Sequence, residues 1–200
     1  HGLAKADSHK FKPIVKKSLK YLNDKDFFTF KNKNTVSKMG DLCIKLFHEN
    51  SIGTIIKHIP GHGLAKSDSH NFKPIVKKSL KYLNDNDFFT FRNKKSFFAM
   101  TAHVVYEKLD NNNTATHSKK IINYIRNKIG FKNILISDDL SMKSLKGDLK
   151  TNTLKSFNAG CNIALHCNGN FDEMKIVAQN SPLISTFIVK KTSQFYKILS

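Results

Sequence analysis

The chain has 200 residues, 40% of them hydrophobic and 10% aromatic, which is the composition of one globular domain with a core of its own. No segment reaches the roughly 18 consecutive apolar residues that a membrane span needs. The formal net charge is +19, but only Arg92 and Arg126 carry the guanidinium that phosphate and base recognition favours. Because the lysines are spread along the chain, we expect a solvated basic surface and neither a nucleic-acid nor a membrane partner.

The cysteines indicate a reducing compartment. Cys43, Cys161 and Cys167 are odd in number and show no CxxC spacing, which favours free thiols over a disulfide framework. We therefore expect a cytoplasmic protein.

The hydrophobic pattern alternates between helical and strand periodicity along the chain. A helix is expected over residues 36–49, with Met39, Leu42, Cys43 and Leu46 on one apolar face. The other expected elements, in chain order, are strands at 53–59 and 97–106, a helix at 118–130, a strand at 133–136, a helix at 154–160, a strand at 162–165 and a helix at 171–177. Ser118 is placed to cap its helix and Gly130 to end it. This alternation predicts a parallel α/β fold.

Each expected strand ends in polar and titratable side chains. They are Lys57, His58, His103, Asp138, Asp139, His166 and Cys167. Such groups at the carboxyl ends of parallel strands are typical of a β/α barrel active site. An open doubly wound sheet gathers ligands at the same edge, but the chain has no GxGxxG or Walker loop. A barrel is therefore the expected architecture.

Two groups suggest acid-base chemistry. Asp68 and His70 are two residues apart, so an extended backbone places both side chains on one side, and a carboxylate beside an imidazole favours a proton donor near neutral pH. Asp138 follows the apolar run 133–136 and is expected to project from a strand end. A separate carboxylate and proton donor suit retaining glycoside hydrolysis. Both have simpler interpretations: Asp68 and His70 as an exposed loop, and the segment at Asp138 as a helix cap, with Asp139 and Ser141 capping the next helix.

A metal-dependent hydrolase is a second interpretation. The possible ligands are His58, His62, His70, His103, His166, Asp68 and Asp138. The HxxxH spacing from His58 to His62 contains Pro60 and Gly61, which oppose a helix, so the usual helical ligand pair is not expected.

Five motifs together resemble a known family. They are KHIPGHG with the following DSH (57–70), AMTAHVVY (99–106), ISDDLSM (136–142) and AGCNIALHCNG (159–169). In this order they resemble the bacterial β-N-acetylhexosaminidases of glycoside hydrolase family 3. The resemblance implies roughly the second half of a (β/α)8 TIM-barrel-like domain. It also implies a cytoplasmic enzyme that removes terminal N-acetylglucosamine from peptidoglycan fragments during cell-wall recycling.

The resemblance also implies roles for individual residues. Asp138 would be the nucleophile that forms a covalent glycosyl intermediate. His70 would be the general acid/base, with Asp68 as its partner. Lys57 and His58 would hydrogen-bond the sugar hydroxyls.

His62 and His103 are assigned only structural or supporting roles. We expect no cofactor and no metal, a small carbohydrate as the partner, and a monomer at full length. A β-glucosidase-type family member and a basic non-catalytic binding fragment remain alternatives.

The front of the chain repeats part of this region. Residues 1–32 match residues 62–93 at an offset of 61, with four differences. The first copy lacks the Lys-His-Ile-Pro-Gly segment before its His, so Asp7 and His9 are expected to have no catalytic role. We interpret residues 33–200 as the second half of the barrel and residues 1–32 as a misjoined duplicate. Because half a barrel leaves strand edges unpaired, we expect the chain alone to show little or no glycosidase activity.

Overall fold

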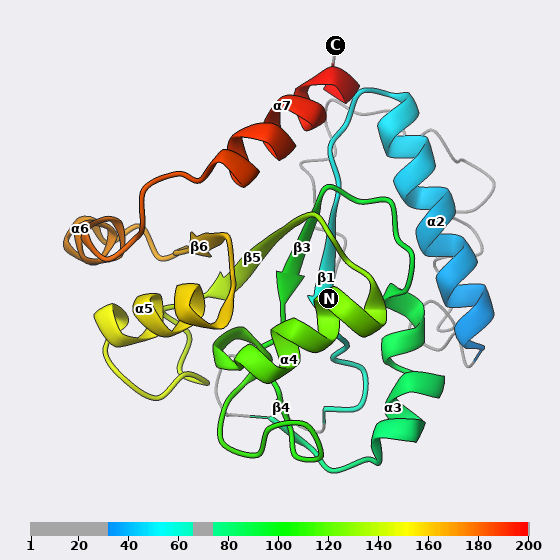
Figure 1. The fold of residues 1–200 in the computed structure, drawn as a ribbon, viewed down its shortest axis with the longest axis horizontal. Coiled ribbons are helices and arrows are strands. Elements are labelled where there is room, and N and C mark those ends of the chain that lie inside the picture. The colour runs from blue at the N-terminus through cyan, green and yellow to red at the C-terminus, as the bar shows by residue number, and fades with distance from the viewer. Residues whose placement is uncertain (1–31, 66–73, 200) are drawn as a thin grey trace. The chain divides into compact units, whose positions relative to one another are not determined.

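A four-stranded parallel sheet organises the unit formed by residues 33–200. The computed structural model describes residues 32–65 and 74–199. The sheet consists of β1 (Ile55–Ile59), β3 (Phe98–Thr101), β5 (Ile134–Asp139) and β6 (Ile163–Leu165), in the order β1-β3-β5-β6 (Figure 1). Each neighbouring pair is parallel. The carboxyl ends of all four strands therefore lie at one edge of the sheet, as the barrel prediction requires.

A second, two-stranded sheet follows the carboxyl ends of β1 and β3. It pairs β2 (Ile75–Val76) with β4 (Val105–Tyr106) in parallel. The single strand expected over 97–106 is wrong in this respect, since β3 ends at Thr101 and β4 belongs to the other sheet. Residues 102–104 between them are fully buried. The segment 97–106 is apolar apart from Thr101 and His103, and this pattern does not show where a strand changes sheet, which explains the error.

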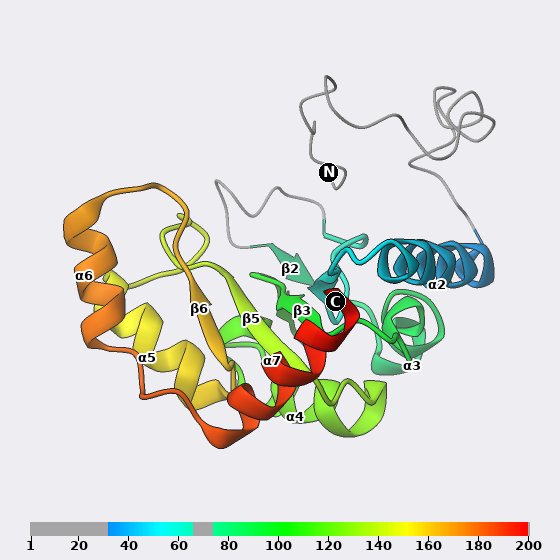
Figure 2. The same cartoon turned by 90° about the horizontal axis from the view of Figure 1, so that it is seen from above.

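Helices connect the strands in chain order. They are α2 (Lys33–Glu49), α3 (Leu80–Asp85), the 3₁₀ helices η2 (Phe88–Phe91) and η3 (Ala115–His117), α4 (Lys119–Tyr124) with the π-helical η4 (Ile125–Ile129), α5 (Leu149–Ala159), α6 (Phe171–Gln179) and α7 (Thr186–Leu199). Figures 1 and 2 show α2 and α3 near the β1 side of the sheet, and α5 and α6 near the β6 side. In the part of the chain that is described, no helix is both long and apolar enough to cross a membrane.

Local signals set the helix ends much as the sequence predicts. The Ser118 hydroxyl accepts the backbone N–H of Ile121 at the start of α4. Gly130 and Gly160 end η4 and α5 in left-handed conformations, with φ of 86° and 115°. Glycine adopts this conformation without a Cβ penalty. Sequence reasoning did not anticipate α3 or α7.

The main core lies between the sheet and α4. It joins Ala99 and Leu135 of the sheet to the isoleucine face of α4 and η4, which consists of Ile121, Ile122, Ile125 and Ile129. All of these side chains are almost fully buried. The period of three and four along 121–129 is thus the contact face of the helix, as predicted.

The expected apolar face of α2 is wrong. Ile44 is the buried residue of this helix, whereas Met39 and Leu42 are 38% and 45% exposed and Cys43 is exposed. The helix packs mainly against η2, and it lines a cavity together with residues of β1, which is an edge strand in the described sheet. At the other end of the sheet, β6 is the opposite edge, so the described part of the sheet is open and not a closed barrel.

Candidate active site

Two of the predicted site residues, His58 and Asp138, lie close together at the carboxyl edge of the sheet. His58 comes from β1 and Asp138 from β5, and their Nε2 and Oδ2 atoms are 3.6 Å apart. This separation is an ion-pair distance and too long for a hydrogen bond. The other carboxylate oxygen, Oδ1, accepts the backbone N–H of Asp139 at 2.9 Å. The pair is mostly buried, with side-chain exposures of 25% and 14%.

Burial lowers the pKa of His58 from 6.5 to about 4. The nearby Asp138 carboxylate opposes this change, and Lys57, His62 and His103 reinforce it. The imidazole is therefore neutral near pH 7, with one nitrogen able to donate a hydrogen bond and the other able to accept one. A neutral imidazole suits contact with sugar hydroxyls and adds no positive charge beside Asp138.

His103 is fully buried behind this pair and is held at both ring nitrogens. Its Nε2 lies 2.9 Å from the carbonyl oxygen of Asp139, and its Nδ1 lies 2.8 Å from the Thr116 hydroxyl. A carbonyl only accepts, so Nε2 carries the proton. Burial lowers the pKa of His103, so Nδ1 accepts from Thr116, and Thr101 can donate in turn to the Thr116 oxygen at 2.9 Å. His103 thus fixes the backbone directly after Asp138.

Asp139 has a different task from its neighbour. Its carboxylate accepts the backbone N–H and the hydroxyl of Ser141, at 3.0 Å and 2.8 Å, and the backbone N–H of Cys167 at 3.3 Å. It therefore ties the end of β5 to the segment after β6. The expectation that Asp139 and Ser141 cap the next helix is wrong, because α5 begins at Leu149 and is capped by Asp148.

A histidine, His166, also follows the last strand of the sheet, β6, but its side chain contacts a helix. His166 Nε2 lies 2.6 Å from Glu173 Oε2 on α6, and the His166 side chain is 5% exposed. The contact lowers the pKa of Glu173. Next to it, burial and the charges of Asp139 and Asp138 raise the pKa of Cys167, which places this thiol near the candidate nucleophile. His166 accordingly joins β6 to α6.

The turn that follows β1 rests on two residues that sequence reasoning missed. The Tyr106 hydroxyl donates to the carbonyl oxygen of Gly61. The Asp87 carboxylate accepts the backbone N–H of Gly63, and burial raises its pKa to about 6. Two sequence features could have pointed to these residues. Tyr106 lies within the AMTAHVVY motif, and Asp87 is an acidic residue directly before the mainly apolar segment Phe88–Phe91.

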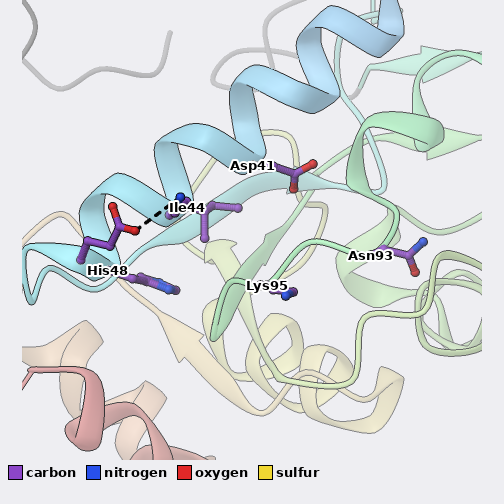
Figure 3. Close-up of a pocket in the computed structure, with 7 residues that line it drawn as sticks. Asp41, Ile44, His48, Asn93 and Lys95 are labelled. Carbon is purple, nitrogen blue, oxygen red and sulfur yellow. Dashed lines mark ion pairs between the residues drawn. The ribbon is translucent and has the colours of Figure 1, made fainter.

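The Lys57 side chain is exposed and lines a cavity of about 300 Å³ between α2 and β1. A second cavity of about 490 Å³ lies beside α2, where Asp41, Ile44 and His48 line it together with Asn93 and Lys95 (Figure 3). Asp138 lines neither cavity. Lys57 is nevertheless close enough to lower the pKa of His58.

The predicted acid/base pair lies outside the described residues. Asp68 and His70 fall within 66–73, and Asp7 and His9 fall within 1–31. Their placement relative to Asp138 stays a prediction. In residues 32–65 and 74–199, no group of three or more His, Cys, Asp or Glu side chains is arranged to hold a metal ion.

A parallel β/α fold with a carboxylate and an imidazole at its carboxyl edge defines a portion of a TIM-barrel-like domain. Residues 31–191 match the family described as the glycosyl hydrolase family 3 N terminal domain. This match covers most of the chain, and the chain therefore belongs to glycoside hydrolase family 3.

Individual relatives agree with this assignment. The chain is 29% identical over 142 residues to a beta-hexosaminidase of Methylobacillus flagellatus, covering 68% of the chain and 41% of that protein. It is 34% identical over 143 residues to a beta-hexosaminidase of Neisseria meningitidis serogroup C, covering 69% and 40%. The structure of native NagZ from Neisseria gonorrhoeae aligns with a TM-score of 0.61 and 32% identity, covering 72% of the chain and 42% of that structure. The chain thus spans about 40% of the length of these curated relatives.

Proposed function

We propose that this chain is part of a retaining β-N-acetylhexosaminidase that hydrolyses terminal N-acetylglucosamine. The observation that carries the proposal is the Asp138 carboxylate, which stands at the end of β5, 3.6 Å from a neutral His58, and has no hydrogen-bonded cation among residues 32–65 and 74–199. A nucleophile needs a charge that no neighbour neutralises, and it needs hydrogen-bonding groups beside it for the sugar. Family membership and the names of the relatives agree with this chemistry.

In the proposed mechanism, Asp138 attacks the anomeric carbon and forms a covalent glycosyl ester. His70, oriented by Asp68, protonates the leaving oxygen and then removes a proton from the water that hydrolyses the ester. His58 and Lys57 bind sugar hydroxyls. His103 acts on the reaction indirectly, because it holds the backbone of Asp139 and so the direction in which Asp138 projects.

The proposed substrate is an N-acetylglucosaminyl muropeptide or oligosaccharide, and the proposed setting is cytoplasmic cell-wall recycling by a monomeric full-length enzyme. We further propose that residues 33–200 form the second half of the barrel and that residues 1–32 are a misjoined duplicate. The family match begins at residue 31, which agrees with this division. Sequencing the source locus across codons 25–40 tests it, and one continuous upstream reading frame that includes the duplication would overturn it.

The test of function uses the full-length protein recovered from the source locus. It should hydrolyse a chromogenic N-acetylglucosaminide and a muropeptide-like substrate, and the 200-residue chain alone should not. A 5-fluoro-N-acetylglucosaminyl fluoride should leave the sugar attached to the peptide that contains Asp138, as measured by mass spectrometry. A label on another residue would overturn the assignment of the nucleophile, and an inactive full-length protein would overturn the proposed function.

A further inference from the structure

The Asp87 carboxyl group lies directly against the turn that follows β1. A Cβ added to Gly61 would lie 2.4 Å from Asp87 Cγ and 2.5 Å from Oδ2, which is closer than real atoms approach. Gly61 is therefore required where it stands, because only glycine leaves room for the carboxyl group. Asp87 accepts the Gly63 N–H, while its Oδ2 atom is buried without a hydrogen-bond partner.

Tyr106 holds the same turn from β4. Its hydroxyl donates to the Gly61 carbonyl, and its side chain is fully buried. Its ring meets the ring of Phe88 edge to face, with centroids 5.2 Å apart. Phe88 directly follows Asp87 in the chain and is also fully buried, so packing fixes both residues that contact the turn.

The turn leads back to the candidate active site. It begins directly after Ile59, and its residue His62 places its ring 5.6 Å from the ring of His58. The same turn is therefore held at the Gly61 carbonyl and the Gly63 N–H, on either side of His62. A shift of this turn would move His62 and with it the surroundings of His58.

We propose that Asp87, together with Tyr106, is a positioning residue for the His58–Asp138 pair and acts through the backbone of residues 60–63. Burial of an aspartate with one unpartnered oxygen costs free energy, so packing alone does not explain the carboxyl group at this position, whereas its contact with the Gly63 N–H does. The catalytic consequence rests on the proposed function, whereas the positioning contact does not.

The first test measures the His58 ring by NMR titration in the 200-residue chain, without substrate. Asp87→Ala should loosen the turn and hydrate His58, so that the His58 pKa moves from about 4 toward 6.5. Asp87→Asn keeps an oxygen for the Gly63 N–H and should restore most of the original value. Asp148→Ala, which removes the cap of α5, is the matched control, and should lower the melting temperature without changing the His58 pKa.

The second test measures kinetics in the full-length protein. Asp87→Ala should lower kcat/KM by about 10- to 100-fold, the scale of a small displacement of reacting groups, and Asp148→Ala should not. Tyr106→Phe should act in the same direction more weakly, and it serves if Asp87→Ala does not fold. An unchanged His58 pKa in Asp87→Ala or, if that variant does not fold, in Tyr106→Phe would overturn the proposal. If the NMR shift occurs and the unaltered protein lacks glycosidase activity, the proposed function fails and the positioning role stands.

Discussion

Two histidine–carboxylate pairs lie at the carboxyl edge of the same sheet, and they differ in the distance between the imidazole nitrogen and the carboxylate oxygen. His166 and Glu173 meet at 2.6 Å, whereas His58 and Asp138 stand 3.6 Å apart. The short contact is a hydrogen bond that links the end of β6 to α6. The long contact places the Asp138 carboxylate beside a neutral imidazole without a hydrogen bond between them. A histidine close to a carboxylate is therefore not enough to indicate a catalytic site. A pair that is close but not hydrogen-bonded, and so can still contact a substrate, is the better indication.

The largest expected contrast between the two pairs is in turnover. In the full-length protein, Asp138→Asn should lower kcat by about 10⁴-fold or more, because it removes the nucleophile. Glu173→Gln, the same change in the other pair, should leave kcat within about threefold. Hydrolysis of a chromogenic N-acetylglucosaminide measures both. Equal losses in the two variants would show that the distinction between the pairs is wrong.

The next contrast is in the dependence of stability on pH. His58 has a pKa of about 4 when folded and 6.5 when unfolded, so between these values the unfolded state binds the extra proton. The free energy of unfolding should therefore fall as the pH drops through this window, by about 3 kcal/mol in total. His58→Gln should remove this contribution, as measured by urea unfolding from pH 7 to 4.

The contribution of Asp87 to the free energy of unfolding has the opposite pH dependence, so it must be separated from that of His58. The pKa of Asp87 rises from 3.8 to about 6 on folding, so its contribution favours the folded state as the pH falls. Because Asp87 is present in both the unaltered chain and His58→Gln, their difference isolates His58. A difference that does not change with pH would contradict the lowered pKa of His58.

The smallest contrast is in stability at neutral pH, where the two pairs should differ in sign. Asp138→Asn should be neutral or stabilising by up to about 1 kcal/mol, because it removes a mostly buried carboxylate that lies 3.6 Å from a neutral His58, while the amide oxygen can still accept the Asp139 N–H. Glu173→Gln should lower the melting temperature, because it removes the charged acceptor of a buried imidazole. Thermal unfolding of the 200-residue chain measures both, and destabilisation by Asp138→Asn would mean that this carboxylate supports the fold.

Much of the architecture follows from local patterns. The period of three and four along 121–129 predicts the contact face of α4, and Ser118, Gly130 and Gly160 mark helix ends because capping depends on a few neighbouring residues. The buried face of α2 cannot be predicted from its own residues, because it depends on the elements that pack against the helix. The break between β3 and β4 does not follow either, because both segments are buried.

For the site, the motifs, their order and the family they resemble can be read from the residues alone. The sequence also placed Asp138 at the end of an apolar strand, since hydrophobic pattern and residue type are local properties. Three features became visible only in the folded chain: His166 bonds to Glu173, a Cβ at Gly61 would collide with Asp87, and Asp87 and Tyr106 hold the turn. These depend on distances and burial between residues such as Gly61 and Tyr106, which are 45 positions apart. Burial also sets the pKa values of His58 and Asp87, and no single segment contains that information.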